Sequence, residues 1–145
     1  MAARSIDFPS SVPLDHPARD ILRKLNGKQR GRVEFLLLPE RDYHEEIPLW
    51  NQLLDTSLVG IGLVAGGAEQ LFVSSDGRCF GSSEVHDAFY YHADSLRRYM
   101  WMPLFRKRSR PMLRPDQDSV DLYGLTFRRG DSEVYYPPAT RSESK

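Results

Sequence analysis

Residues 58–81 read LVGIGLVAGGAEQLFVSSDGRCFG, and the way apolar runs alternate with short polar breaks in this stretch decides the fold. The runs predict three β-strands, at 58–64, 70–74 and 78–81. The connection Ser75-Asp76-Gly77 is typical of a tight hairpin turn, because glycine adopts a positive φ without steric cost. The stretch therefore predicts an antiparallel meander.

The middle strand of this meander should be covered on both faces. Leu71 and Val73 point to one side of a strand and Phe72 to the other, so apolar groups lie on each side. The preceding glycines, in the segment 60–66, follow a GxGxxxG pattern that resembles a dinucleotide fingerprint. That fingerprint needs a strand before the glycines and a helix after them. Here another strand follows, so we interpret the glycines as a bend or bulge and expect no cofactor.

Three helices flank the predicted strands. The first begins near Pro17 and stops at Asn26-Gly27. A strand candidate at 33–38 precedes the second helix, which covers about 47–55, and the third starts after Asp94 as its N-cap and stops before Pro103. The apolar positions that these helices should bury are Ala18, Ile21, Leu22 and Leu25, then Leu49, Trp50, Leu53 and Leu54, then Leu96, Tyr99 and Met100. Residues 84–91 fit either a strand or a helix.

The C-terminal third is less regular. Residues 105–117 contain two prolines and most of a basic cluster, which predicts a long exposed connection. Strands at 120–127 and 133–136, joined around Arg129-Gly130-Asp131, should form a final hairpin. The Ser/Pro-rich start, 1–14, and the polar end, 139–145, are expected to be loose tails around one domain at 15–138.

The composition suits one α+β domain with a core of its own. The chain has 145 residues, 40% of them hydrophobic, and a formal net charge of zero. Its single cysteine, Cys79, cannot form an internal disulfide, and the first residues hold no apolar signal-peptide core, so we expect a cytoplasmic protein. The longest apolar run is far shorter than the roughly 20 residues that cross a membrane.

Catalytic and metal chemistry find little support in the residue spacing. His86, Asp87, His92 and Asp94 are potential metal ligands, but the two histidines lie on different faces of a helix and share a face only in a strand. A structural zinc site of the thiolate kind is excluded, since the chain has one cysteine. Cys79 lies in an apolar strand where a thiol is usually inert. We therefore expect no metal, and a non-enzymatic protein.

The zero net charge hides two patches of opposite sign. Residues 40–96 carry ten acidic and two basic groups, whereas residues 97–114 carry seven basic and no acidic groups. The acidic block suits a surface matched to a basic partner. The basic segment, interleaved with Tyr99, Trp101 and Phe105, suits a nucleic-acid-binding strip. The two blocks could instead neutralise each other within the domain. The expected partner contacts are Glu40, Asp42, Tyr43, Glu45, Glu46, Glu84, Asp87 and Tyr90, and the expected nucleic-acid contacts are Arg97, Arg98, Arg106, Lys107, Arg108 and Arg110.

Four segments carry a resemblance to a known family. They are ARDILRKLNG at 18–27, Trp50, LVGIG at 58–62 and QLFVSSDGRCF at 70–80. Together they resemble the SUKH superfamily, and within it the third (SUKH-3) group of immunity proteins; the related virus-encoded US22-type branch shares the pattern. The resemblance covers about residues 18–102, and the extension after Met102 has no counterpart.

The resemblance implies a fold and a function. It implies an α+β domain with one antiparallel or mixed sheet and helices packed on it. Members of the superfamily are binding modules that neutralise a cognate toxin, often a nuclease, by occluding it, and they contribute no catalytic residues. On this basis we expect a protein-binding domain that faces a toxin with its acidic block. The alternative is a nucleic-acid-associated accessory protein that uses the basic segment 97–114.

Overall fold

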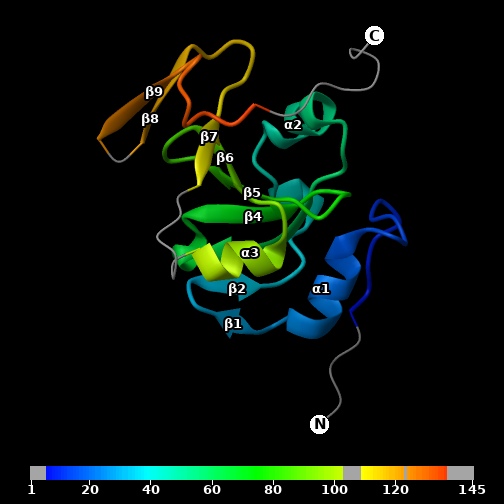
Figure 1. Ribbon diagram of the computed structural model, residues 1–145. Helices are drawn as coiled ribbons and strands as arrows, with labels where there is room; N and C mark the ends of the chain where they lie inside the picture. Colours follow the sequence, from blue (N-terminus) through cyan, green and yellow to red (C-terminus); the bar gives the residue numbers. More distant parts are fainter. Residues whose placement is uncertain (1–5, 103–108, 123, 137–145) are drawn as a thin grey trace.

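The computed structural model describes residues 6–102, 109–122 and 124–136. These residues form three α-helices, a seven-stranded sheet and a separate two-stranded hairpin (Figure 1). The helices are α1 (Pro17–Leu25), α2 (Ile47–Leu54) and α3 (Leu96–Trp101). The strands of the main sheet are β1 (Gln29–Arg30), β2 (Val33–Phe35), β3 (Val59–Val64), β4 (Glu69–Val73), β5 (Cys79–Ser83), β6 (Ala88–Ala93) and β7 (Arg110–Met112). The hairpin consists of β8 (Ser119–Leu122) and β9 (Leu125–Arg128), and short 3-10 turns lie at Glu40–Asp42 (η1) and Ala65–Gly67 (η2).

The main sheet is an antiparallel meander in which each strand pairs with the next one along the chain, in the order β1 to β7. This confirms the α+β class and the meander predicted from residues 58–81. Residues 84–91, which fitted either a strand or a helix, form a turn followed by the start of β6. Beyond β2, the predicted strand at 33–38 continues only as two backbone hydrogen bonds, from Leu36 and Leu38 to β3.

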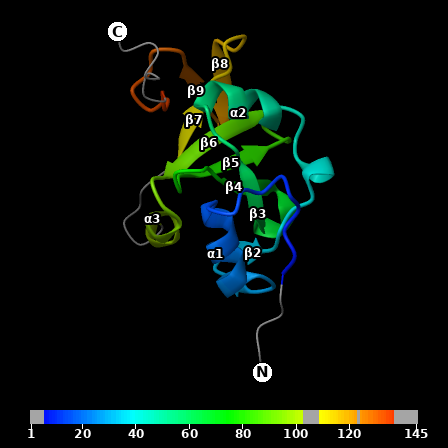
Figure 2. The ribbon, with the colours of Figure 1, turned by 90° about the vertical axis from the view of Figure 1, so that its right-hand side faces the viewer.

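Helices cover the sheet on both faces (Figure 2). On one face α1 packs against Leu71 and Val73 of β4, and Tyr99 of α3 joins the same core. On the other face α2 packs against a core that includes Phe72 and Phe80. Leu71, Phe72 and Val73 are all fully buried, which confirms that β4 is covered on both sides.

The glycines of β3 sit at an irregularity in the sheet, as predicted. The register between β3 and β4 shifts between Gly60 and Gly62, which is the signature of a bulge. A Cβ at Gly62 would lie 2.7 Å from the backbone oxygen of Glu34, so no larger residue fits without displacing β2. The residues after these glycines form η2 and then β4 instead of a phosphate-binding helix.

The helix boundaries match the prediction closely, with one correction. The first helix begins after His16, whose Nδ1 accepts a hydrogen bond from the N–H of Ala18 at 3.1 Å. The N-cap of α3 is Ser95, not Asp94, because the Ser95 hydroxyl accepts the N–H of Arg98. In α2 the buried positions are Ile47, Trp50 and Leu54, whereas Leu49 stays 37% exposed.

The C-terminal prediction was wrong in two places. Within the supposed connection 105–117, residues 110–112 form β7, which pairs with β6 at the end of the sheet. Pro111 fits there because an edge strand needs no N–H on its open side. The hairpin reverses between Leu122 and Leu125, next to Gly124 at φ +79°, and not around residues 129–131. Residues 133–136 form no strand, although the N–H of Tyr135 bonds to the carbonyl of Pro111.

The N-terminal segment is more ordered than the expected tail. Val12 is buried, and Ile6 and Phe8 pack against the core beneath α1. Residues 1–5 and 139–145 of the expected tails lie outside the described residues. In the described part of the chain, no helix has the length and apolar character needed to cross a bilayer.

Candidate functional site

Acidic side chains from segments far apart in the sequence meet around His44. Its Nε2 lies 3.2 Å from Oε1 of Glu84, and its Nδ1 lies 2.7 Å from the hydroxyl of Ser82. That hydroxyl donates to Oε1 of Glu46 at 3.2 Å. The meander brings these groups together because Ser82 lies near the end of β5, Glu84 begins the β5–β6 turn, and Glu46 directly precedes α2.

Arg114 joins this cluster from the segment after β7. Its Nη1 lies 2.7 Å from Oε2 of Glu46, and its two terminal nitrogens lie 3.2 and 3.3 Å from the carboxylate oxygens of Asp87. Its Nε lies 3.2 Å from Asp116. The hydrogen bonds to Asp87, together with the other two carboxylates, raise the pKa of Arg114 and outweigh the effect of its burial. The guanidinium is therefore a fixed positive charge that holds three acidic groups in place.

The cluster contains one structural carboxylate and several accessible ones. The Glu46 side chain is only 15% exposed, whereas those of Glu84, Asp87 and Asp116 are more than 70% exposed. Glu40, Asp42 and Glu45 are exposed as well, and Glu40 and Glu45 line one small cleft of about 260 Å³. We call the exposed group the acidic surface; its members are Glu40, Asp42, Glu45, Glu84, Asp87 and Asp116.

The acidic surface keeps a clear excess of negative charge. Residues 40–46, 82–87 and 114–117 hold seven carboxylates against two cations, Arg41 and Arg114, which leaves a charge of −5. The carboxylates of Asp42 and Glu45 make no ion pair or hydrogen bond within the described ranges. Partial internal pairing through Arg114 therefore leaves most of the patch unneutralised.

The two tyrosines expected as partner anchors are occupied inside the fold. The Tyr43 hydroxyl accepts the N–H of Gly60 at 2.9 Å, and its ring packs edge-on against Phe72 with centroids 5.0 Å apart. Burial raises the pKa of Tyr43, although its hydrogen bond to Gly60 opposes the shift. Tyr90 is 5% exposed and packs in a core that the β8–β9 hairpin completes. An exposed apolar group that the sequence did not single out is Val85, which is 82% exposed between Glu84 and Asp87.

Of the six residues predicted for the nucleic-acid strip, the structure describes Arg97, Arg98 and Arg110, and all three are exposed. Arg97 and Arg98 are exposed on α3, and Arg98 lies 3.7 Å from Asp94. Arg110 donates to the carbonyls of residues 132–134 and lies over the ring of Tyr135. Arg114 belongs to the cluster described above. Arg106, Lys107 and Arg108 lie outside the described residues.

Some of these features had a sequence signal and others had none. Asp116 lies two residues after Arg114, so the pairing of these two charges could be predicted from the sequence alone. The contact between Arg114 and Glu46 joins residues 68 positions apart, and it depends on β7, which the sequence did not predict. The role of Ser82 depends on its register opposite Gln70 of β4 and was equally invisible.

The part of the chain that the structure describes offers no group of three or more His, Cys, Asp or Glu side chains that could hold a metal ion. Cys79 is a buried free thiol, and burial raises its pKa to about 12, so it stays protonated and unreactive. Similarity to other proteins assigns no function either: no protein-family model, curated protein or solved structure matches the chain.

Proposed function

We propose that the chain is a non-enzymatic protein-binding domain that neutralises a toxin by occupying its basic active-site groove, as an immunity protein does. A nuclease is the class of toxin that presents such a groove. The observation that carries the proposal is the acidic surface, whose six exposed carboxylates come from three segments that His44 and Arg114 link to one another. The SUKH resemblance of residues 18–102 points to the same kind of function.

The patch suits fast and selective binding of a cationic partner. A surface of one sign steers an opposite charge toward it and can raise association rates roughly 10- to 1,000-fold. Arg114 and His44 fix the backbone segments that carry the carboxylates, so little flexibility is lost on binding. Asp42 and Glu45 have no internal partner to give up within the described ranges, so they can pair with a partner's Lys or Arg directly.

An apolar contact is available within the same patch. Val85 is 82% exposed and lies in the chain between Glu84 and Asp87. Interfaces commonly place apolar anchors inside a polar rim. We assign the anchor position to Val85 and the charged rim to the carboxylates around it.

Capture followed by titration tests the proposal. The full chain is used to capture partners from its own cells at low and at physiological salt, and a captured protein is purified and titrated by calorimetry. We expect a basic protein that binds one to one and loses its toxic activity in the complex. The variant Asp42→Asn/Glu45→Gln should weaken binding roughly tenfold or more. The control Asp15→Asn/Asp20→Asn removes the same charge near and on α1, away from the patch, and should leave the affinity within about twofold.

Two results would contradict the proposal. One is an unchanged affinity in Asp42→Asn/Glu45→Gln, which would place the interface elsewhere. The other is capture of nucleic acid in place of a protein, with binding lost in Arg97→Gln/Arg98→Gln and with a steep dependence on salt. That outcome would favour the accessory role on nucleic acid.

A further inference from the structure

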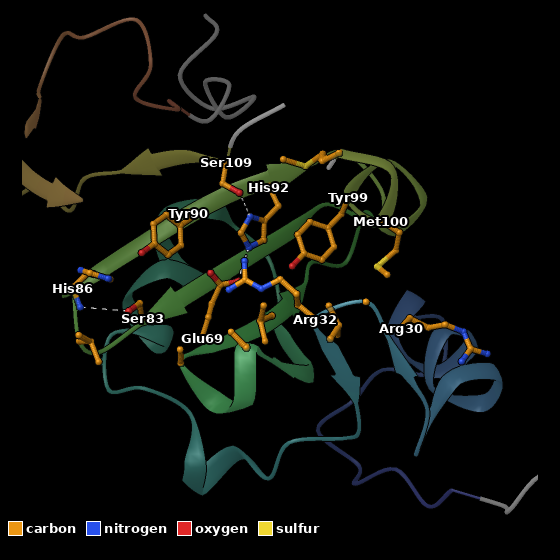
Figure 3. Close-up of a pocket in the computed structure, with 17 residues that line it drawn as sticks. Arg30, Arg32, Glu69, Ser83, His86, Tyr90, His92, Tyr99, Met100 and Ser109 are labelled. Carbon is orange, nitrogen blue, oxygen red and sulfur yellow. Dashed lines mark hydrogen bonds and ion pairs between the residues drawn. The ribbon is translucent and has the colours of Figure 1, made fainter. Parts of the chain in front are cut away.

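A cavity of about 590 Å³ opens on the face of the sheet that carries α1 and α3 (Figure 3). Residues of β4, β5 and β6 line it, together with the ends of β2 and β3 and the side chains of Tyr99, Met100 and Met102. Its size lies within the range of roughly 300–1,000 Å³ that small-molecule sites occupy. None of the six carboxylates of the acidic surface lines it, although Val85, which lies between two of them in the chain, does.

The cavity contains a chain of polar side chains that is largely removed from solvent. Oε2 of Glu69 lies 2.7 Å from Nε2 of His92, and the two side chains are 17% and 4% exposed. The other ring nitrogen of His92 contacts the hydroxyl of Ser109. A Cβ at Gly81 would lie 2.4 Å from both Glu69 and His92, so this pair occupies space that only a glycine leaves open. The missing side chain of Gly81 thus leaves room for the Glu69 carboxylate, which His92 holds in place.

Two hydrogen-bond donors near this carboxylate have no use inside the fold. The hydroxyl of Tyr99 and the guanidinium of Arg32 make no hydrogen bond or ion pair within the described ranges, and Figure 3 shows both directed into the cavity. Burial raises the pKa of Tyr99; the charge of Glu69 adds to this, and that of Arg32 opposes it. The hydroxyl therefore keeps its proton at neutral pH and remains available as a donor beside a cation.

The walls provide flat rings as well as aliphatic groups. The ring of His92 lies between two tyrosine rings. Its centroid is 4.6 Å from that of Tyr99 and 6.0 Å from that of Tyr90, which stacks on it. Val33 and Val64 line the same space. A ligand that fills the cavity needs an acidic group for Arg32 and Tyr99, hydroxyl or amine donors for Glu69, and a planar apolar body.

We propose that this cavity binds a nucleoside monophosphate. The phosphate accepts hydrogen bonds from Arg32 and Tyr99, the ribose hydroxyls donate to Glu69, and the base packs among the rings. Oε2 of Glu69 is taken up by Nε2 of His92, which leaves its Oε1 for the ribose hydroxyls. A fatty acid would offer no hydroxyl to the second oxygen of Glu69, and a simple anion would leave the rings without a partner, which is why neither fits as well.

Calorimetric titration of the full chain with defined probes tests the proposal. The probes are AMP, GMP, CMP and UMP, with adenosine, ribose 5-phosphate and inorganic phosphate as truncated ligands. We expect one of the four monophosphates to bind at one site and each of its fragments to bind at least tenfold more weakly. NMR shifts on binding should cluster at Val33, Glu69 and Tyr90.

Two variants examine the assigned contacts. Arg32→Gln and Tyr99→Phe should each weaken binding roughly tenfold or more, because each removes a hydrogen bond to a charged phosphate. Tyr99→Phe removes a hydroxyl that the fold does not use, so its thermal unfolding should match that of the wild type. Arg23→Gln on α1 is the charge control and should bind like the wild type.

Three outcomes would overturn the proposal. They are the absence of binding by all four monophosphates, equal binding of inorganic phosphate, and unchanged affinity in both Arg32→Gln and Tyr99→Phe. None of them bears on the acidic surface, whose test uses a protein partner and different variants.

Discussion

Replacing Arg114 with methionine should destabilise the protein and loosen the acidic surface. The substitution keeps most of the apolar length of the side chain but removes the contacts to Glu46, Asp87 and Asp116. Removing one partner of a fully buried ion pair costs roughly 3–5 kcal/mol, whereas an exposed pair contributes about 0–1 kcal/mol. Arg114 and Glu46 are 17% and 15% exposed, which lies near the buried end, while Asp87 and Asp116 are largely exposed. We therefore expect a loss of roughly 2–3 kcal/mol.

Urea unfolding monitored by fluorescence measures this loss directly, and it should appear as a lower midpoint with an unchanged slope. In Arg114→Met/Glu46→Gln the carboxylate left without its cation is also gone, so the double variant should be more stable than Arg114→Met alone. Arg98→Met is the control, because its pair with Asp94 spans 3.7 Å between two exposed side chains and should change stability by about 0.5 kcal/mol or less. A loss below about 1 kcal/mol in Arg114→Met, or a double variant less stable than the single one, would refute the role of Arg114.

Three further predictions follow from the core and the first helix. Gly62→Ala should cost roughly 1–3 kcal/mol in urea unfolding, because its Cβ would meet the backbone oxygen of Glu34, and a neutral effect would contradict the close approach of β2 and β3. Burial lowers the pKa of His16 below 6.5, and protonation of His16 would remove the acceptor that caps α1. The free energy of unfolding should therefore keep its full value above pH 6.5 and decrease as the pH falls below 6.5. The decrease should be smaller in His16→Asn, which keeps a capping oxygen. Cys79, with its pKa near 12, should react with a thiol reagent only at the rate of unfolding, and rapid labelling of the folded protein would show that β5 opens locally.

Local signals account for the parts of the fold that the sequence predicted. Pro17 and Asn26-Gly27 mark the ends of α1, and Asp76-Gly77 marks the turn between β4 and β5, because each acts on its own backbone neighbours. The alternation of Leu71, Phe72 and Val73 told which side of β4 each faces, since a strand has a period of two.

Long-range contacts account for the misses. The strand β7 contains Pro111, and its pairing with β6 depends on an edge position that only the assembled sheet provides. The final hairpin turns next to Gly124 and not at the predicted Gly130, because Val120 pairs with Phe127, and no signal within either turn shows this pairing.

The same difference between local and long-range signals applies to the candidate sites. Charge counts along the chain located the acidic block, because the carboxylates of 40–46 and 84–87 lie in two short segments. They could not show that Glu46 is held inside by Arg114, nor that Tyr43 is bound to Gly60, because both contacts join different elements. The pair of Glu69 and His92 was invisible for the same reason, since 23 residues separate its members and a glycine makes room for it.

Hydrogen exchange of the chain with and without its captured protein partner tests the central claim most directly. If the acidic surface is the interface, binding should protect the amides of residues 40–46 and 84–87 and leave α1 and α3 unchanged. Protection confined to α3 and the β1–β2 hairpin, with residues 40–46 exchanging as in the free chain, would contradict the account.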